Sequence, residues 1–233
     1  MLDPTRIKAI SLDLDDTLWP IWPTIERAEK VLHDWLAEHA PMAAALFSSP
    51  AALREIREHM ASRRPDLRND LSALRRESIR LALLRAGEDP LLAEAAFEAF
   101  FAERQRVELY EDALPALEFL SRRWPLVSVS NGNADLARVG LSAFFGASLS
   151  AREFGVGKPD PRIFHAAAGA AQAQAHEVLH VGDDATLDAL GAVQAGMQAV
   201  WLNRGGHPWP HEGEAPPQVA SLTQLCEWLG QGA

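Results

Sequence analysis

Cysteine, positive charge and long apolar runs are all scarce in this sequence of 233 residues. The single thiol, Cys226, can form neither an internal disulfide nor a cysteine metal cluster, which favours a reducing compartment. The 22 lysines and arginines are outnumbered by 32 aspartates and glutamates, and the net charge of −10 argues against binding to nucleic acid or to an anionic membrane. No window is long and apolar enough to span a membrane, and residues 1–10 lack the apolar centre of a signal peptide. We therefore expect a cytoplasmic protein that binds neither nucleic acid nor membranes.

The residues that are present follow two patterns. Residues 20–108 are helical in pattern throughout, with the helix-start signals Ser49-Pro50 and Asp89-Pro90, and we expect four helices there. In the rest of the chain short apolar strands, at residues 7–14, 126–130, 178–181 and 199–202, alternate with helical stretches. This alternation predicts an α/β fold in which helices cover both faces of a parallel, Rossmann-like sheet. The expected domains are a core formed by residues 1–19 and 109–233, and a helical domain, residues 20–108, inserted behind the first strand.

Polar residues follow the expected strands, and in an open parallel sheet ligands bind at this carboxyl edge. They are Asp13, Asp15 and Thr17 after the first strand, Ser130 and Asn131 after the second, Lys158 in a later loop, and Asp183 and Asp188 after the strand at 178–181. A hard divalent cation such as Mg²⁺ would hold Asp13 and Asp183 ionised side by side. The hydroxyl of Ser130, the ammonium of Lys158 and the backbone N–H groups of the Asn131 turn suit a phosphate. A metal, a phosphate site and a spare carboxylate together indicate phosphoryl transfer.

Each of these features also has an interpretation without function. Asp15 or Asp16 could cap a helix, and Ser130-Asn131-Gly132 is a good turn sequence in its own right. An ordinary turn between a strand and a helix would equally explain Gly182-Asp183-Asp184, and the role of Asp184 stays open. The functional interpretation is favoured because all of these groups lie at expected strand ends, in order along the chain.

Taken together, the residues resemble the motifs of the haloacid dehalogenase superfamily over essentially the whole chain. Asp13–Thr17 match its motif DxDx[TV], and Ser130, Lys158 and the pair Asp183 and Asp188 match the hydroxyl, lysine and GD…D motifs that follow. The helical insertion resembles the small α-helical cap of this superfamily. The resemblance implies an enzyme in which Asp13 attacks phosphorus to form an aspartyl phosphate, while Asp15 acts first as general acid and then as general base.

The same resemblance implies the surroundings of the reaction. Mg²⁺ would be bound by Asp13, the backbone carbonyl of Asp15 and Asp183, and the phosphoryl oxygens by Ser130, Asn131 and Lys158, with Asp188 and Thr17 as supporting residues. Members of the superfamily that are dehalogenases lack an aspartate two residues after the nucleophile. Asp15 therefore favours the phosphatase branch.

The segments "WPLVSVSNGNAD" and "LHVGDDATLDALGA" look like a bacterial branch that includes phosphatases of flavin mononucleotide and of a phosphorylated riboflavin precursor. We therefore expect a Mg²⁺-dependent phosphatase of small phosphorylated metabolites, either a monomer or a homodimer. A sugar-phosphate mutase is the alternative, while a haloacid dehalogenase or a non-catalytic binding protein of the same fold is less favoured. Trp19 and Trp22, at the start of the insertion, could stack on an aromatic part of the substrate or simply pack the hinge.

Overall fold

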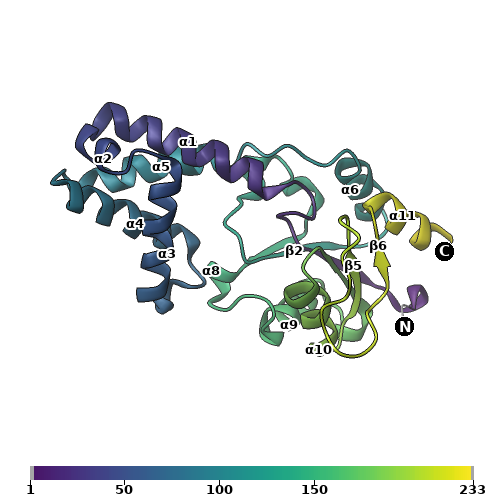
Figure 1. The fold of residues 1–233 in the computed structure, drawn as a ribbon. Coiled ribbons are helices and arrows are strands. Elements are labelled where there is room, and N and C mark those ends of the chain that lie inside the picture. Colours follow the sequence, from purple (N-terminus) through teal and green to yellow (C-terminus); the bar gives the residue numbers. More distant parts are fainter. Residues whose placement is uncertain (1–2, 232–233) are drawn as a thin grey trace. The chain divides into compact units, whose positions relative to one another are not determined.

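The computed structural model describes residues 3–231 of the chain, which divides into two compact units. We call them the core unit (Met1–Pro20 and Glu108–Ala233) and the helical unit (Ile21–Val107). In Figure 1 the helical unit carries the labels α1 to α5, and the strands belong to the core unit. The chain enters the helical unit soon after the first strand and returns before α6, so the core unit is discontinuous in sequence.

A six-stranded sheet forms the centre of the described core unit, with the strand order β3-β2-β1-β4-β5-β6 and every neighbouring pair parallel. The strands are β1 (Ala9–Leu12), β2 (Leu126–Ser130), β3 (Ala147–Ser150), β4 (Val178–Gly182), β5 (Gln198–Leu202) and β6 (Gln218–Val219). The predicted parallel α/β sheet is confirmed, and the four predicted strands are β1, β2, β4 and β5. The sequence does not predict β3, which is only partly buried at one edge of the sheet, or β6, which has two residues.

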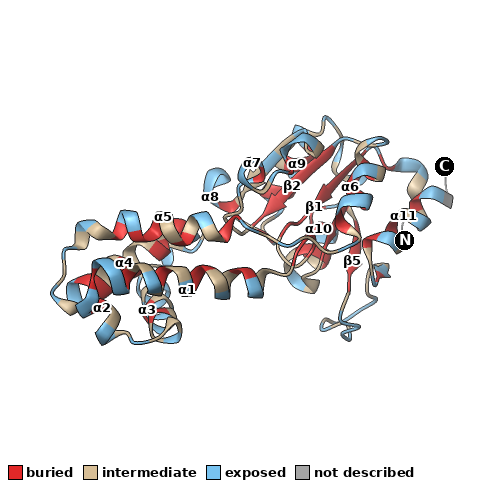
Figure 2. Ribbon diagram, turned by 90° about the horizontal axis from the view of Figure 1, so that it is seen from above, coloured by how far each residue is buried: buried red, intermediate tan, exposed pale blue. Residues whose placement is uncertain are grey.

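Helices cover both faces of this sheet, as the alternating sequence predicts. They are α6 (Ala113–Ser121), α7 (Leu136–Val139), α8 (Ala151–Phe154), α9 (Pro161–Ala170), α10 (Gly191–Gln194) and α11 (Leu222–Gln231), with a π-helical turn at Ala185–Leu190. On one face, Phe164 of α9 and Ala192 of α10 belong to the same buried cluster as Val127 and Val129 of β2. Figure 1 shows α6 and α11 on the opposite side, and Figure 2 shows β1 and β2 buried along their length. Burial on both faces explains why these strands are almost continuously apolar.

The segments that lead into and out of the insertion are joined within the core unit. The backbone N–H of Tyr110 donates to the carbonyl oxygen of Leu18 at 2.9 Å. Arg204, which follows β5, donates to the carbonyl oxygen of Thr17 at 3.1 Å and to both carboxylate oxygens of Asp112 at 3.0 and 2.9 Å. Its guanidinium carbon also lies 4.0 Å from the centroid of the Tyr110 ring. The outgoing and returning segments are thus held side by side beyond the carboxyl edge of the sheet.

The helical unit contains five α-helices. They are α1 (Ile21–His39), α2 (Pro41–Leu46), α3 (Pro50–Arg63), α4 (Leu71–Ala86) and α5 (Ala93–Arg104). The expectation of four helices is corrected to five, because Pro41 occupies the first position of a short helix, α2, that begins directly after α1. Ser49 caps α3 by accepting the N–H of Ala52 at 3.3 Å, and Gly87 ends α4 with a φ of +73°.

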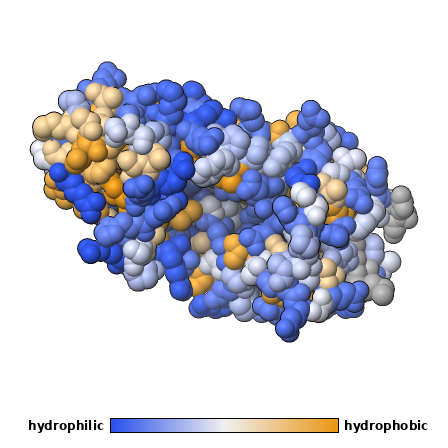
Figure 3. Space-filling model, in the orientation of Figure 1, coloured by the Kyte–Doolittle hydropathy of each residue, from blue (hydrophilic) through white to orange (hydrophobic). Residues whose placement is uncertain are grey.

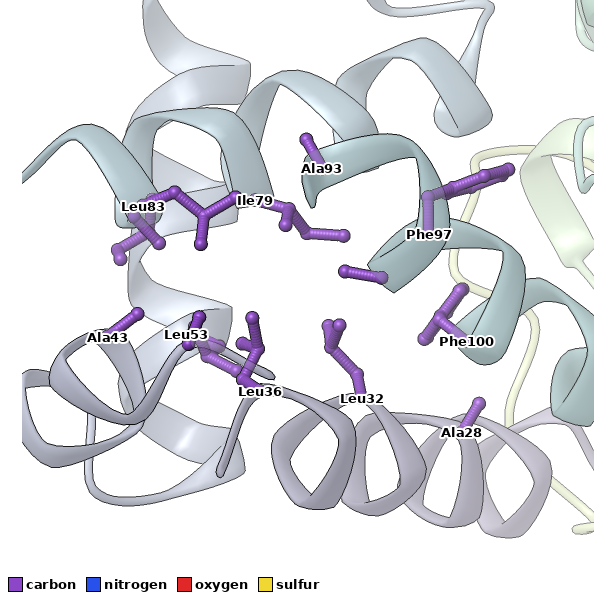
Figure 4. Close-up of a cluster of buried hydrophobic side chains, with 14 residues drawn as sticks. Ala28, Leu32, Leu36, Ala43, Leu53, Ile79, Leu83, Ala93, Phe97 and Phe100 are labelled. Carbon is purple, nitrogen blue, oxygen red and sulfur yellow. The ribbon is translucent and has the colours of Figure 1, made fainter. Parts of the chain in front are cut away.

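The helical unit has a hydrophobic core of its own, drawn in Figure 4. All five helices contribute buried side chains, among them Leu32 and Leu36 from α1, Ala43 from α2, Leu53 from α3, Ile79 and Leu83 from α4, and Phe97 and Phe100 from α5. A buried carboxylate lies in the same unit, where Glu29 pairs with Arg54 at 2.5 Å and with Arg75 at 3.3 Å. Burial lowers the pKa of Arg75 to about 10.

The face drawn in Figure 3 is mostly hydrophilic. Hydrophobic surface gathers there over the part of the helical unit that holds α2 and α4, and this unit exposes Met42, Leu46, Leu84 and Leu91. Among the described residues, no helix is both long enough and apolar enough to cross a membrane.

Candidate active site

Two aspartates meet where β1 and β4 end. Asp13 directly follows β1, and its backbone N–H donates to the carbonyl oxygen of Val181 in β4 at 2.9 Å. Asp183 directly follows β4. The hydroxyl of Thr17 lies 3.3 Å from Asp13 Oδ2 and 3.3 Å from Asp183 Oδ1. The parallel pairing of β1 with β4 thus places the carboxylates of Asp13 and Asp183 close to the same hydroxyl, that of Thr17.

Lys158 lies between two carboxylates. Its Nζ donates to Asp13 Oδ1 and, at 2.5 Å, to Asp188 Oδ1, and its side chain is 2% exposed. Asn131, which follows β2, fixes the backbone of the lysine: Asn131 Nδ2 donates to Lys158 O, and Lys158 N donates to Asn131 Oδ1, both at 2.8 Å. The side-chain amide of Asn131 is therefore committed to the loop that carries Lys158.

Asp188 is held by three donors. Its Oδ1 accepts from Lys158 and, at 3.0 Å, from His180 Nε2, while its Oδ2 accepts the backbone N–H of Asp184 at 3.1 Å. The carboxylate packs against the end of β4 because Gly182 has no side chain, and a Cβ there would lie 2.3 Å from Asp188 Cγ. The side chain of Asp184 has a different role, since it caps the π-helical turn by accepting two backbone N–H groups at 2.7 and 2.8 Å.

Asp15 is held by a tryptophan. Its Oδ1 accepts from Trp19 Nε1 at 2.8 Å, and Trp19 is completely buried. The turn between the two residues is closed by the N–H of Asp16, which donates to the carbonyl oxygen of Trp19 at 2.7 Å from a left-handed conformation with a φ of +59°. Asp15 Oδ2 lies against Gly132, where a Cβ would be 2.3 Å from it. The lack of a side chain at Gly132 allows this carboxylate to approach the turn after β2.

Ser130 and Trp22, the remaining candidates, lie in different units. Ser130 ends β2, is 4% exposed, and accepts the N–H of Gly132 through its Oγ at 2.9 Å. Trp22 belongs to the helical unit and is 50% exposed, and the guanidinium carbon of Arg54 lies 4.5 Å from the centroid of its ring. Trp19 and Trp22 therefore have different surroundings, since the first is buried against Asp15 and the second is at the surface.

Asp13, Asp183 and Asp188 form a group that we call the aspartate cluster, and Lys158 pairs with two of its three carboxyl groups. One oxygen of each lies within 4.8 Å of the others. Burial raises the pKa of Asp13 well above its ordinary value although Lys158 opposes this, and burial together with the charge of Asp188 raises the pKa of Asp183 to about 7. Burial also disfavours the charge of Asp188, but Lys158 and His180 outweigh it and hold the pKa of Asp188 below its ordinary value. The pKa of Lys158 is raised, because Asp13 and Asp188 outweigh the effect of burial.

This donor set suits a hard divalent cation. Carboxylate oxygens are the ligands that Mg²⁺ prefers in proteins, and a bound cation would relieve the burial and repulsion that raise the pKa of Asp13 and of Asp183. Asp188 is engaged by Lys158 and His180, so Asp13 and Asp183 are the carboxylates best placed to bind it. Within residues 3–231, the aspartate cluster is the only group of three or more acidic, histidine or cysteine side chains arranged to hold a metal.

Three residues at this site are not indicated by the motifs. Ser11 Oγ and His180 Nδ1 lie 2.8 Å apart, and both residues are completely buried. Trp201 Nε1 donates to the carbonyl oxygen of Asp183 at 2.7 Å. A polar residue inside an otherwise apolar strand, as in "AISL" and "VLHVG", is the signal that identifies Ser11 and His180 as residues in need of a partner. No comparable signal marks Trp201.

Known proteins resemble this chain over most of its length. A sequence model of the haloacid dehalogenase-like hydrolases matches residues 7–196. The chain is 34% identical over 201 residues to 5-amino-6-(5-phospho-D-ribitylamino)uracil phosphatase YigB of Escherichia coli strain K12, and the match covers 84% of each chain. It is similar to the crystal structure of a 2-haloacid dehalogenase from Pseudomonas syringae pv. tomato DC3000, with 39% identity, a TM-score of 0.88, and coverage of 97% of this chain and 100% of that one. It is also similar to a HAD phosphatase from Thermococcus onnurineus, with 25% identity, a TM-score of 0.69, and coverage of 96% and 98%.

Proposed function

Because this chain belongs to the haloacid dehalogenase-like hydrolase family, we propose that it hydrolyses phosphate monoesters of small metabolites. Asp15 carries this proposal. An alkoxide leaving group needs a proton in order to depart, whereas a halide does not. Asp15 supplies a second carboxylate two residues after Asp13, and Trp19 holds it in place at 2.8 Å. The similarity to the 5-amino-6-(5-phospho-D-ribitylamino)uracil phosphatase of E. coli supports the same class of substrate.

In the proposed reaction Ser130, Lys158 and the backbone at Asn131 bind the phosphoryl oxygens, and Asp13 attacks phosphorus. A bond forms between a carboxylate oxygen of Asp13 and phosphorus, while the bond from phosphorus to the alcohol oxygen breaks. Lys158 has a third N–H group for a phosphoryl oxygen, because Asp13 and Asp188 engage two. The proton of Asp15 passes to the departing oxygen, so that a neutral alcohol leaves.

Hydrolysis of the aspartyl phosphate completes the cycle. Asp15, now ionised, accepts a proton from a water molecule whose oxygen attacks phosphorus; the bond to Asp13 breaks, and inorganic phosphate leaves. Trp19 holds Asp15 through Oδ1, and Oδ2 of the same carboxylate lies against Gly132 in the turn after β2. Mg²⁺ held by Asp13, Asp183 and the backbone carbonyl of Asp15 would supply the positive charge that balances the carboxylates and polarises the phosphoryl group.

We assign substrate choice to the helical unit, acting as a cap, and name flavin mononucleotide and the phosphorylated riboflavin precursor as the first substrates to test. The E. coli relative is named as a phosphatase of 5-amino-6-(5-phospho-D-ribitylamino)uracil. Trp22 offers a half-exposed aromatic ring of the kind that stacks on a flat heterocycle.

A haloacid dehalogenase is the second candidate function. It is favoured by the 39% identity and TM-score of 0.88 to the P. syringae structure described under that name. The two functions differ in the group that is released, which makes them easy to separate.

The test measures both released groups from the same enzyme preparation. Phosphate release is followed from flavin mononucleotide, from the ribitylaminouracil phosphate and from p-nitrophenyl phosphate, and chloride release is followed from 2-chloropropionate, each with and without Mg²⁺. We expect phosphate release that requires Mg²⁺, and no chloride. Chloride release without phosphate release would instead support the dehalogenase.

Three variants connect the activity to the site. Asp13→Asn should abolish phosphate release, because an amide cannot form the aspartyl phosphate, and Asp15→Asn should lower it by about a hundredfold or more. Asp160→Asn is the matched control, since Asp160 caps α9 in the core unit and asparagine caps a helix equally well. Near wild-type activity in Asp13→Asn would contradict the mechanism.

A further inference from the structure

A row of hydrogen bonds runs through the buried part of the core unit beneath the aspartate cluster. Ser11 Oγ and His180 Nδ1 are 2.8 Å apart, His180 Nε2 and Asp188 Oδ1 are 3.0 Å apart, and Asp188 Oδ1 and Lys158 Nζ are 2.5 Å apart. The last hydrogen bond of the row is the one that Lys158 Nζ donates to Asp13 Oδ1. Ser11 and His180 are direct neighbours in the pairing of β1 with β4, so the sheet itself brings the first two members together.

The donors and acceptors along this row fix where the imidazole proton lies. Asp188 accepts at both oxygens, from Lys158 and His180 at Oδ1 and from the backbone N–H of Asp184 at Oδ2, and a carboxylate that only accepts requires a donor at His180 Nε2. Nδ1 is then the acceptor for the hydroxyl proton of Ser11.

The ring of His180 has no freedom to turn away. It is completely buried. It also makes an edge-to-face contact with the ring of Phe164 from α9, with the two ring centroids 5.0 Å apart and the ring planes at 88°. With the ring fixed, the Nε2–H group points at one oxygen of Asp188 and selects its orientation.

We propose that His180 is a positioning residue, which through Asp188 holds the ammonium of Lys158 at the phosphoryl site. This inference rests on the proposed function, because it gives Lys158 the task of binding the phosphoryl group. A buried polar side chain in the middle of a sheet costs stability unless its hydrogen bonds are made, and both ring nitrogens of His180 have a partner here. Volume alone does not account for a histidine at this position, since leucine would fill a similar space.

A matched pair of variants tests the proposal. The amide nitrogen of His180→Gln can take the place of Nε2 and donate to Asp188, whereas the shorter side chain of His180→Asn can reach only the place of Nδ1, beside Ser11. We expect kcat on p-nitrophenyl phosphate to fall about tenfold to a hundredfold in His180→Asn and to be restored to within about threefold of wild type in His180→Gln. His165→Gln is the control, because the ring of His165 contacts the backbone carbonyl of Ala195 at 2.9 Å and not a carboxylate of the site. Equal kcat values for the Gln and Asn variants, at equal melting temperature, would overturn the proposal.

A second measurement does not depend on turnover. The nitrogen chemical shifts of the His180 imidazole, measured by NMR on metal-free protein, should show a protonated Nε2. A neutral ring protonated at Nδ1 would overturn the proposal whatever the activity. The affinity for inorganic phosphate, measured by calorimetry, should fall at least tenfold in His180→Asn but not in His180→Gln.

The two hypotheses fail in different ways. If the wild-type enzyme releases no phosphate from any ester, the proposed function is wrong, and the NMR measurement still decides whether Nε2 of His180 donates to Asp188. If the wild-type enzyme is an active phosphatase and the Gln and Asn variants are alike, the role of His180 is wrong and the proposed function stands.

Discussion

Replacing Trp19 by phenylalanine would remove the indole N–H that binds Asp15 Oδ1 at 2.8 Å and leave the carboxylate itself in place. In the first step of the proposed reaction Asp15 gives up its proton, and its oxygens become more negative in the transition state. A donor already aimed at one of those oxygens stabilises the developing charge without having to move. Trp19→Phe should therefore slow the release of alcohols that need protonation.

The size of the effect follows from the kind of bond that is lost. A hydrogen bond contributes about 1.5–3 kcal/mol to a charged group and about 0.5–1.5 kcal/mol to a neutral one, so the gain as Asp15 becomes negative is about 1–1.5 kcal/mol. Since about 1.4 kcal/mol corresponds to a factor of ten in rate, we expect kcat/KM for an alkyl phosphate to fall by a factor of about 5 to 13. Trp19 is completely buried, so the variant will also be less stable, though by less than the about 3–5 kcal/mol typical of replacing a buried tryptophan by alanine.

The assay compares an alkyl phosphate with p-nitrophenyl phosphate, whose leaving group departs readily as an anion. The ratio kcat/KM includes only steps up to the first irreversible one, so it isolates cleavage of the ester from hydrolysis of the aspartyl phosphate. Trp19→Phe should lower kcat/KM for the alkyl ester and change it little for p-nitrophenyl phosphate. Trp124→Phe is the control, because the indole N–H of Trp124 binds the carbonyl oxygen of Ile7 at 3.2 Å instead of a carboxylate. Equal losses on both esters would refute the reasoning and show that Trp19 only packs the core unit.

Further results are expected for the metal site, for Cys226 and for Trp22. Chelation of divalent cations should abolish phosphate release, and Asp183→Ala should raise the Mg²⁺ concentration for half-maximal activity at least tenfold; activity that survives chelation would contradict the metal site. Burial raises the pKa of Cys226 to about 11, so at pH 8 iodoacetamide should alkylate the folded protein about a hundredfold more slowly than the urea-unfolded protein, with a rate that rises about tenfold per pH unit up to pH 10. Because the folded thiol keeps its proton to higher pH, the stability that this group contributes should fall as pH rises between about 9 and 11. Trp22→Ala should lower kcat/KM for flavin mononucleotide about tenfold to a hundredfold more than for acetyl phosphate, and equal losses would retire the idea that its ring stacks on substrate.

The parts of the fold that the sequence predicts are those with a strong local pattern. β1 and β4 are short apolar runs because helices bury them on both faces, and the helix starts at Ser49 and Asp160 are marked by a capping side chain followed by proline. β3 has no such pattern, since its residues lie partly exposed at a sheet edge. The sequence does not predict the short helix α2 either, because six residues hold too few turns for a periodic pattern.

In the candidate site, too, some features can be predicted from the sequence and others cannot. Because parallel strands end at one edge of a sheet, the sequence predicts that Asp13 and Asp183 lie at the same edge. That they lie side by side follows from the pairing of β1 with β4, which the structure shows. The hydrogen bonds that orient the side chains are a different matter. Asn131 and Lys158 are 27 positions apart and Ser11 and His180 are 169 apart, and their contacts depend on strand register and on side-chain rotamers that no local pattern encodes. This is why Asn131 is identifiable as a residue of the site but its bonds to the backbone of Lys158 are not.

The joined segments at the carboxyl edge of the sheet bear on how such an enzyme can change over evolution. The chain leaves the core unit and comes back at points where Leu18 O and Tyr110 N are 2.9 Å apart, with Arg204 fastening Thr17 to Asp112 beside them. An insertion whose ends already touch can grow, shrink or be exchanged with little effect on the sheet, because the free-energy cost of closing a loop rises only slowly with its length. The helical unit brings a hydrophobic core of its own, so it behaves as a replaceable module. Deleting residues 21–107 and rejoining the ends with a short polar linker would require that linker to cross a gap that one hydrogen bond already spans.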